Sequence, residues 1–234
     1  MTAANPICVA LDTPNIARAC DLARALKPHA GYLKIGMEFF YGHGQLGFEA
    51  VAAEGLPIFL DLKLHDIPNT VASAMKSLMN LNPRPAIVNL HATGGLDMMK
   101  AARDAVAGRS KLIAVTILTS LSDDDIWKAG FETAKDTEAH ARGLAALAKE
   151  AGLDGVVCSP YDLVGIRHDL GRDFLTVVPG IRPAGAAAQD QKRVATPASA
   201  IGSGADILVI GRAITGALDP AAAAAAIGAT LHAG

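Results

Sequence analysis

The segment DLKLHDIPNT, residues 61–70, holds the densest group of side chains that could do chemistry. It directly follows the apolar run LPIFL at 56–60, and a buried strand does not normally end in such a cluster of charge. Asp61 and Lys63 are two residues apart, so on a strand both side chains point to the same face. Two charges on a buried face each cost several kcal/mol of desolvation unless they are paired. Together with Lys34 on a neighbouring strand they predict a Lys–Asp–Lys array, which either serves a reaction as fixed charge or only plugs one end of the fold.

Asp66, in the same segment, allows two interpretations. It lies past the end of the strand and just before Pro68 and Asn69, which resemble a turn that enters a helix. An acidic residue is favourable near a helix start, because the helix dipole is positive there. Asp66 is therefore either an ordinary helix-start acid or a member of the charge array.

Two other segments, PGIR at 179–182 and VIGR at 209–212, favour an anion site. Glycine permits close approach of the backbone, the N–H groups at the start of a following helix attract anions, and arginine adds bidentate donors. We therefore expect a phosphorylated substrate at Arg182, Gly211 and Arg212. The Gly- and Ala-rich segment PAGAAAQDQK at 183–192 is either a mobile lid over the phosphate or a loose surface loop.

Eight short apolar runs alternate with helical patterns along the chain. The runs are continuously apolar rather than alternating, which is typical of parallel strands covered on both faces. Amphipathic spacing predicts helices at 69–80, 94–108 and 136–152, the last two ending at a glycine, and Asp219-Pro220 opens a final helix. The predicted strands are 6–12, 31–37, 57–63, 86–92, 111–118, 155–159, 174–180 and 206–212.

Eight strand–helix units in an undivided chain of 234 residues match an α/β fold, a single-domain (β/α)8 TIM barrel over residues 1–234. A doubly wound open sheet is the alternative, but no G-x-G-x-x-G turn follows the first run, which disfavours a dinucleotide fold. In a barrel the C-terminal strand ends share one mouth, and chemistry gathers there. The residues expected at that mouth are Asp12, Lys34, Asp61, Lys63, His91, Thr119, Arg182, Gly211 and Arg212.

The composition disfavours several classes of protein. Apolar residues make up 51% of the chain and charged residues 19%, which favours a large core over disorder. A net charge of −2 without a basic run argues against nucleic-acid binding, and the apolar runs are too short to span a membrane. No secretory signal is visible at the N-terminus, so a cytoplasmic protein is expected. Cys8, Cys20 and Cys158 are widely spaced, which predicts three reduced core thiols and no metal or redox site.

Taken in order along the whole chain, the motifs resemble those of the orotidine 5′-monophosphate decarboxylase family, in its type 1, bacterial-like form. The D-x-K-x-x-D pattern at 61–66 alone is less specific, because a wider superfamily shares it, including metal-dependent sugar-phosphate enzymes such as hexulose-phosphate synthase. The continuation IPNT at 67–70, the segment VTILTS at 115–120 and the loop with Gln191 favour the decarboxylases. The matching segments are ALD (10–12), LKIGMEFF (33–40), DLKLHDIPNT (61–70), HATGG (91–95), LTS (118–120), VVCSP (156–160), VVPGIRP (177–183), DQKRVATP (190–197) and VIGRAIT (209–215).

The resemblance implies a reaction, an assembly and a role for each residue. The reaction is the decarboxylation of orotidine 5′-monophosphate to uridine 5′-monophosphate in de novo pyrimidine biosynthesis, without a cofactor or a metal, by a homodimer. Lys34, Asp61, Lys63 and Asp66 would form an alternating charge array, in which Lys63 donates a proton to C6. Asp66, Ile67 and Thr70 would enter the neighbouring subunit's site. The remaining roles would be ribose binding by Asp12, Lys34 and Thr70, pyrimidine contact by Thr119, a bridge between base and phosphate by Gln191, and phosphate binding by Arg182, Gly211 and Arg212.

Two other functions are weighed against this one. A sugar-phosphate lyase or aldolase of the same superfamily would need a divalent metal near Asp61. A catalytically inactive phosphate-binding barrel could serve as a sensor or scaffold, although the intact Lys–Asp–Lys set disfavours it. For a decarboxylase, Asp61 would act either by repelling the substrate carboxylate or by holding Lys63 charged and oriented, and the sequence favours neither.

Overall fold

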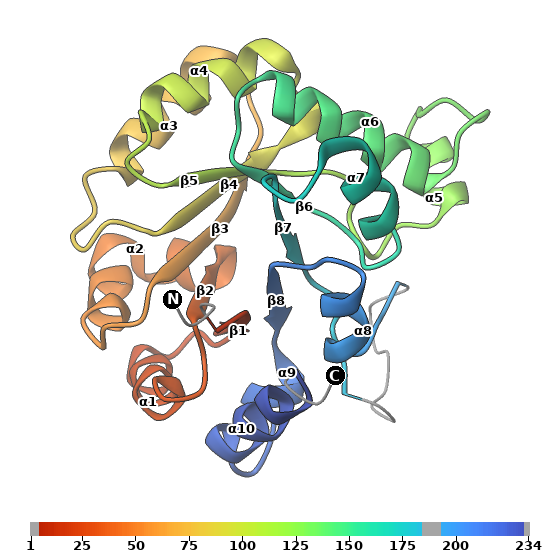
Figure 1. The fold of residues 1–234 in the computed structure, drawn as a ribbon. Coiled ribbons are helices and arrows are strands. Elements are labelled where there is room, and N and C mark those ends of the chain that lie inside the picture. The colour runs from red at the N-terminus through yellow and green to blue at the C-terminus, as the bar shows by residue number, and fades with distance from the viewer. Residues whose placement is uncertain (1–4, 184–192, 232–234) are drawn as a thin grey trace.

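Eight parallel strands close into a barrel in their sequence order, with helices around the outside (Figure 1). The computed structural model describes residues 5–183 and 193–231, so residues 184–192 of the loop predicted at 183–192, with Gln191, lie outside the described residues. The closed ring confirms the predicted (β/α)8 barrel over an open sheet. The strands are β1 (Ile7–Ala10), β2 (Tyr32–Gly36), β3 (Ile58–Leu64), β4 (Ile87–His91), β5 (Lys111–Val115), β6 (Gly155–Val157), β7 (Leu175–Val178) and β8 (Ile207–Ile210).

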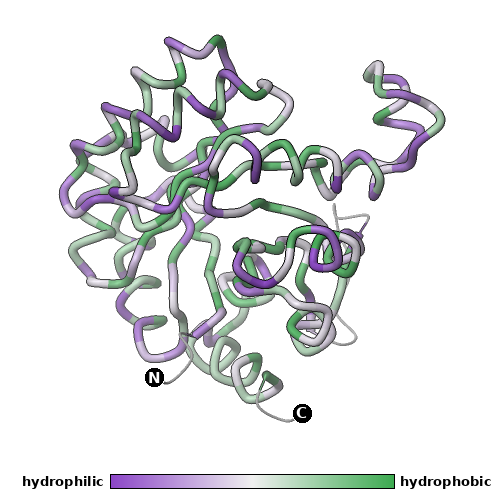
Figure 2. Tube along the Cα trace, turned by 45° about the horizontal axis from the view of Figure 1, so that its top comes forward, coloured by the Kyte–Doolittle hydropathy of each residue, from purple (hydrophilic) through white to green (hydrophobic). Residues whose placement is uncertain are grey.

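Each strand is apolar on both faces because it packs in two directions. Alternate residues fill the barrel interior in a cluster made of strand side chains, with Phe59 as the largest of its fully buried members. The intervening residues, such as Val9 and Leu60, join the larger cluster that also contains buried helix residues. The strands accordingly appear as mostly hydrophobic segments in Figure 2, with the more hydrophilic stretches on the surrounding helices and loops. This double burial explains the continuous apolar runs in the sequence.

The helices follow the predicted pattern and begin at recognisable caps. The side chain of Asp136 accepts a hydrogen bond from the Ala139 N–H at 2.8 Å, and Asp219 accepts one from Ala222 at 2.9 Å. Pro220 occupies the first turn of the Ala-rich last helix, as predicted. The helices are α1 (Ile16–Leu26), α2 (Met37–Ala52), α3 (Pro68–Leu78), α4 (Leu96–Val106), α5 (Asp123–Lys128), α6 (Thr137–Glu150), α7 (Leu163–Leu170), α8 (Pro197–Gly202), α9 (Arg212–Thr215) and α10 (Pro220–Thr230), with a short 3-10 helix, η1 (Ala92–Gly94), after β4.

Two details differ from the sequence-based expectation. Helix α4 does not end directly at Gly108, because Ala107 already takes the left-handed conformation, with φ of 51°, as its C-cap. Cys8 and Cys158 are buried as predicted, and burial raises the pKa of both thiols, that of Cys8 to about 12. Cys20 is only half-buried on α1, where it packs against the edge of the core, so it is not a core thiol.

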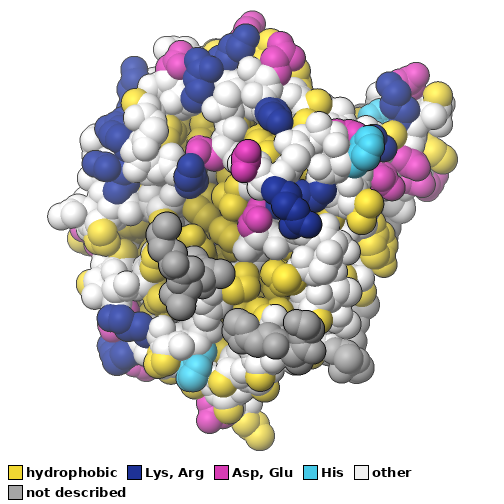
Figure 3. All heavy atoms as spheres, viewed as in Figure 1, with side chains coloured by type: hydrophobic (Ala, Val, Ile, Leu, Met, Phe, Trp, Pro, Cys, Tyr) yellow, Lys and Arg dark blue, Asp and Glu magenta, His cyan; other side chains and the backbone are white. Residues whose placement is uncertain are grey.

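Basic and acidic side chains are interspersed on the face shown in Figure 3, with hydrophobic atoms exposed near its centre. Among the helices of the described residues, none is both long enough and apolar enough to cross a membrane.

Arg167 ties α7 to the N-terminal ends of β7 and β8, far from the barrel mouth. Its guanidinium donates to the carbonyl oxygens of Gly204 and Phe174, at 2.8 and 2.6 Å, and to the hydroxyl of Thr176 at 2.7 Å. It also pairs with Asp206, and its side chain is only 10% exposed. One side chain therefore satisfies backbone and side-chain acceptors from two neighbouring strand ends.

We expect Arg167→Met to lower the free energy of unfolding by about 3 kcal/mol, because it leaves a carboxylate and several carbonyl groups without their donor. Urea denaturation measures the change. Arg142→Met is the matched control: Arg142 pairs with Asp169 through two bonds at 2.7 and 3.0 Å but is 40% exposed, so its loss should cost less than about 1 kcal/mol. Equal losses of stability in the two variants would contradict the proposed stabilising role of Arg167.

Candidate active site

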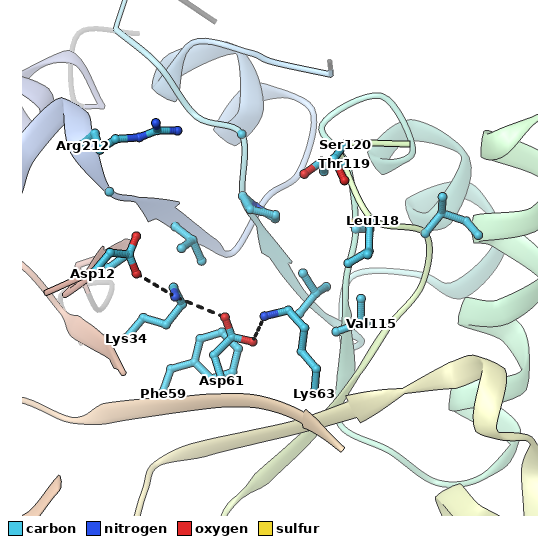
Figure 4. A pocket seen from close by; sticks show the side chains of 18 of the residues that line it. Asp12, Lys34, Phe59, Asp61, Lys63, Val115, Leu118, Thr119, Ser120 and Arg212 are labelled. Atoms are coloured by element: carbon cyan, nitrogen blue, oxygen red, sulfur yellow. Dashed lines mark hydrogen bonds and ion pairs between the residues drawn. The ribbon is translucent and has the colours of Figure 1, made fainter. Parts of the chain in front are cut away.

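A cavity of about 280 Å³ opens at the C-terminal ends of the strands (Figure 4). Phe59 and Ala10 contribute to its inner lining, and charged and polar side chains surround them. The structure brings most of the predicted site residues to this one cavity. The predicted residues that line it are Asp12, Lys34, Asp61, Lys63, Thr119, Arg182, Gly211 and Arg212.

The charged side chains form a continuous row across the first three strands. Asp61 lies in the middle, with its Oδ2 3.2 Å from Lys34 Nζ and its Oδ1 2.7 Å from Lys63 Nζ. Lys34 Nζ also lies 3.5 Å from Oδ1 of Asp12, and Figure 4 shows these three pairs as a chain of dashed lines. The side chain of Asp61 is 9% exposed and that of Lys34 is 12% exposed, so the inner pair is nearly dry.

The pairing keeps the inner two groups ionised in spite of their burial. Burial opposes the charge on Asp61, but the attraction of Lys34 and Lys63 and hydrogen bonds from Lys63 and Asn89 outweigh it, so the pKa of Asp61 is lowered. Burial likewise opposes the charge on Lys34, yet Asp61 and Asp12 raise its pKa. The row of Asp12, Lys34, Asp61 and Lys63 therefore carries two positive and two negative charges.

Strand β3 is irregular at the point where it delivers Lys63. Leu60 pairs with Val88 of β4, but the next pair is Leu64 with Leu90, so three residues of β3 face Asn89 alone. Lys63 takes a left-handed backbone conformation with φ of 52°, which costs a residue with a Cβ about 1–2 kcal/mol. The predicted contact of Asp61 with Lys63 is present, but β3 reaches it through a bulge rather than through a regular strand.

Asn89 is a site residue that the sequence analysis missed. Its side-chain N–H donates to Asp61 Oδ1 at 2.7 Å, and its carbonyl oxygen accepts the backbone N–H of Lys63 at 2.8 Å. It is only 1% exposed on β4. The only indication of Asn89 in the sequence was that an amide side chain stands between Val88 and Leu90 in a mostly apolar run.

Asp66 does not join the row of charges within its own chain. Residues 65–70 are all exposed, and Asp66 does not line the cavity. Its Oδ1 accepts the N–H of Ile67 at 2.6 Å, while Ile67 occupies the cap position of α3 and Pro68 its first turn. Asp66 therefore stands before the cap rather than serving as it, and Ile67 is 66% exposed.

The opposite side of the cavity carries Arg182 and Arg212. Burial and the nearby positive charge of Arg212 lower the pKa of Arg182, and the Nε of Arg182 is buried without a partner among the described residues. A Cβ atom at Gly211 would lie 3.4 Å from Asp12 Oδ2 and 3.6 Å from Ala10 Cβ, so a small side chain there would be in ordinary van der Waals contact with this wall. Two guanidinium groups near each other in a partly buried wall suit a doubly charged anion.

The remaining predicted residues lie around this centre or outside it. Thr119 is 8% exposed in the cavity wall beside Ser120. His91 ends β4 next to the cavity without lining it, and burial, with the neighbouring His65 and Lys63, lowers its pKa. Gln191 falls outside the described residues.

Arg193, a second residue missed by the sequence analysis, supports the wall near Thr119. Its guanidinium pairs with the buried Asp162 at 3.0 Å and donates to the carbonyl oxygens of Ile117 and Leu118 at 3.3 and 3.2 Å. Burial raises the pKa of Asp162 to about 6 despite the attraction of Arg193. The pair fixes the end of β5 against the start of α7.

Comparisons with known proteins agree with this geometry. The family model described as "Orotidine 5'-phosphate decarboxylase / HUMPS family" matches residues 5–227. A protein of Novosphingobium aromaticivorans named orotidine 5'-phosphate decarboxylase is 52% identical over 97% of this chain and 99% of its own length. One of the same name from Rhodospirillum rubrum is 50% identical over 94% of this chain and 91% of its own.

The fold is also that of a solved decarboxylase. The crystal structure of orotidine 5'-phosphate decarboxylase from Lactobacillus acidophilus superposes with a TM-score of 0.84 at 38% identity, over 98% of this chain and all of that one. The matches in sequence and in structure cover all eight strands of the barrel. The chain therefore belongs to the orotidine 5'-phosphate decarboxylase / HUMPS family.

Proposed function

We propose that this chain decarboxylates orotidine 5′-monophosphate to uridine 5′-monophosphate and carbon dioxide, a step of pyrimidine biosynthesis, without a cofactor. The observation that carries the proposal is the ion-paired row of Asp12, Lys34, Asp61 and Lys63, with Lys34 and Asp61 largely buried, in one cavity with Arg182 and Arg212. The names of the closely similar relatives support the same substrate. An ion-pair network that only plugged the barrel would not need an open cavity with two arginines beside it.

The proposed reaction places the proton donor against the carbon that loses carbon dioxide. The bond between C6 and the carboxylate breaks, carbon dioxide leaves, and the electron pair stays on C6. The ammonium of Lys63 stabilises this charge and gives C6 its proton, so that a C6–H bond forms and Lys63 becomes a neutral amine. Water then returns a proton to Lys63. The charges are fixed before the reaction begins, so no reorganisation is needed when the carbanion forms.

The contacts of Asp61 favour one of its two possible roles. Its Oδ1 accepts from both Lys63 Nζ and Asn89, at 2.7 Å each, and its Oδ2 faces Lys34. A carboxylate shared among three donors has much of its charge compensated, which weakens its repulsion of a substrate carboxylate. We propose that Asp61 acts mainly by holding Lys63 charged and oriented.

The rest of the cavity would bind the non-reacting parts of the nucleotide. Arg182, Gly211 and Arg212 would bind the phosphate, and Asp12 and Lys34 the ribose hydroxyls. Thr119 would contact the pyrimidine, and Gln191, outside the described residues, would bridge base and phosphate. Binding energy from the phosphate can be used to exclude water and so to strengthen the charged row.

The exposed segment 65–70 supports a homodimer in which sites are completed across the interface. Asp66, Ile67 and Thr70 are exposed and do not line the cavity of their own chain, and Ile67 presents apolar surface to solvent. We propose that these three residues reach the site of a second copy. There Asp66 would add a fifth member to the row, and Thr70 would join Asp12 and Lys34 at the ribose.

We expect the purified chain to consume orotidine 5′-monophosphate, followed by its ultraviolet absorbance, at the same rate with and without EDTA. Lys63→Ala should lower kcat by more than about 10⁴-fold, because it removes the proton donor and the fixed charge together. Its affinity for uridine 5′-monophosphate, measured by calorimetry, should remain.

Lys111→Ala is the control, since Lys111 pairs with Asp154 at 2.6 Å at the opposite end of the barrel. Inactivation by EDTA would instead favour a metal-dependent sugar-phosphate enzyme of the same family. Retained turnover in Lys63→Ala would remove Lys63 from the role of proton donor.

We expect Arg212→Ala to lower kcat/KM by about 10- to 100-fold, the loss of one charged contact of roughly 1.5–3 kcal/mol to the phosphate. The ultraviolet absorbance assay on orotidine 5′-monophosphate measures it. Orotidine, which lacks the phosphate, should react slowly and equally with both proteins. An unchanged kcat/KM would contradict the phosphate site.

A mixture of two inactive variants tests the shared sites. Lys63→Ala protein and Asp66→Ala protein should each lack activity, but mixed dimers should contain one intact site and regain up to about a quarter of the wild-type activity. The quarter follows from random exchange: half of the dimers are mixed and each has one working site of two. No recovery after subunit exchange, verified with labelled subunits, would mean that Asp66 acts within its own chain.

A further inference from the structure

We infer that Asn89 is a positioning residue of the proposed reaction: it holds the carboxylate of Asp61 and the backbone of Lys63 in their working geometry. This inference rests on the proposed function and extends it to a residue on β4 that touches no substrate. Asn89 is not among the residues that line the cavity. Its effect must therefore pass through the two residues that it bonds.

The two bonds of Asn89 require an amide. The side-chain nitrogen donates to Asp61 Oδ1 at 2.7 Å, and the side-chain oxygen accepts from the Lys63 N–H at 2.8 Å. A carboxylate at this position could accept but not donate, and an apolar side chain could do neither. Because Asn89 is only 1% exposed, water does not readily replace the hydrogen bonds that Asp61 and Lys63 would lose.

The hydrogen bond from the Lys63 N–H to Asn89 fixes the backbone position from which the Lys63 side chain extends. In a regular ladder that continued from Leu60 and Val88, Asp61 would lie opposite Asn89 and Lys63 would lie opposite His91. The bulge keeps Lys63 level with Asn89, two residues or about 7 Å short of that position. The strained backbone at Lys63, with φ of 52°, persists only where its surroundings hold it, and the Asn89 carbonyl is the group that accepts its N–H.

The bond to Asp61 fixes the plane of its carboxylate. Oδ1 of Asp61 accepts from Asn89 and from Lys63 Nζ, both at 2.7 Å, while Oδ2 faces Lys34. Without the donor on Asn89, the carboxylate is free to rotate between the two ammonium groups. The direction of the Lys63 ammonium then depends on a partner that is no longer fixed.

If Asn89 acted only on stability, its loss would not change the protonation of Asp61. The pH profile of activity therefore distinguishes a positioning role from a purely structural one. The charged and titratable groups that act on Asp61 and on its neighbours are Lys34 and Lys63, with Asp12, His91 and Cys8 farther out. Asp61 is needed as an anion, so activity is lost as pH falls through its pKa. Losing the hydrogen bond from Asn89 raises that pKa and moves the acid limb of kcat/KM to higher pH.

The experiment compares Asn89→Leu, Asn89→Asp and Thr176→Val. Thr176 is also fully buried on a strand and hydrogen-bonded, to Gly204 at 3.1 Å, but at the other end of the barrel. For each variant we would measure kcat and KM for orotidine 5′-monophosphate, the affinity for uridine 5′-monophosphate, the melting temperature and the pH profile. The unsubstituted chain must be active in the same assay; its inactivity would count against the proposed function itself.

We expect Asn89→Leu to lower kcat by about 30-fold or more, with product affinity within about threefold of wild type and the acid limb moved to higher pH. Asn89→Asp keeps the acceptor for Lys63 but sets a second carboxyl against Asp61. One proton shared by the two carboxyls would restore the donor, so activity should be highest at lower pH and decline as that proton leaves. Thr176→Val should lower the melting temperature without changing kcat or the pH profile.

Opposite shifts of the pH profile in the two Asn89 variants would support the inference. If Asn89→Leu does not fold, a shift of the activity of Asn89→Asp to lower pH supports it. A kcat within about threefold of wild type in a folded Asn89 variant, with an active wild type, would overturn it. So would a wild-type pH profile in both variants, since Asn89 would then act only on stability, as Thr176 does.

Discussion

The site depends on one buried anion. Asp61 lies between two ammonium groups, at 3.2 Å from Lys34 Nζ and 2.7 Å from Lys63 Nζ, in a wall where its side chain is 9% exposed. None of the three groups would be stable there alone, because the desolvation of an unpaired buried charge costs several kcal/mol. Lys34 and Lys63 hold Asp61 ionised, and Asp61 in turn holds Lys34 ionised, which makes the row a unit rather than a set of independent residues. Removing any member changes the protonation of its neighbours as well as the contact itself.

A parallel barrel suits such a unit because it brings many strand ends to one place. Lys34 and Asp61 arrive on neighbouring strands that pair directly, so their spacing is set by the ladder, and Asp12 follows the end of β1, whose Ala10 pairs with Lys34. Lys63 is the exception, since it needs a bulge, a left-handed residue and the amide of Asn89 to reach Asp61. The interior below the row is filled with apolar side chains such as Phe59, which keeps water from entering it from beneath. The barrel therefore sets the positions of most of the charged residues, and the bulge in β3 sets the contact between Lys63 and Asp61.

The sequence was sufficient for the barrel and for most of the cavity, for physical reasons. Continuous apolar runs identify doubly buried strands, and the (β/α)8 topology then places every strand end at one mouth, so the members of the row could be named. The alternation rule could not foresee the backbone at Lys63, because a bulge depends on contacts with the next strand. Asn89 was missed for the same reason: within one run it looks like an isolated polar substitution, and its meaning appears only with its partners on β3. The prediction that Cys20 is a core residue was wrong, because composition alone does not distinguish a helix position at the edge of the core from one inside it.

The charges of the cavity also explain why the segment 61–70 would be divided between two subunits. Asp12, Lys34, Asp61 and Lys63 sum to zero, so the row alone neither attracts nor repels an anionic nucleotide at long range. Arg182 and Arg212 add two positive charges at the far side of the cavity, which match a phosphate dianion. A third carboxylate, from Asp66 of a second copy, would make the row negative, which would favour the ammonium form of Lys63 but oppose the substrate carboxylate. In the proposed dimer, delivering that carboxylate from a second copy, through an exposed segment, would spare each chain the cost of folding around an uncompensated buried charge, because the charge would be buried only when the site is completed.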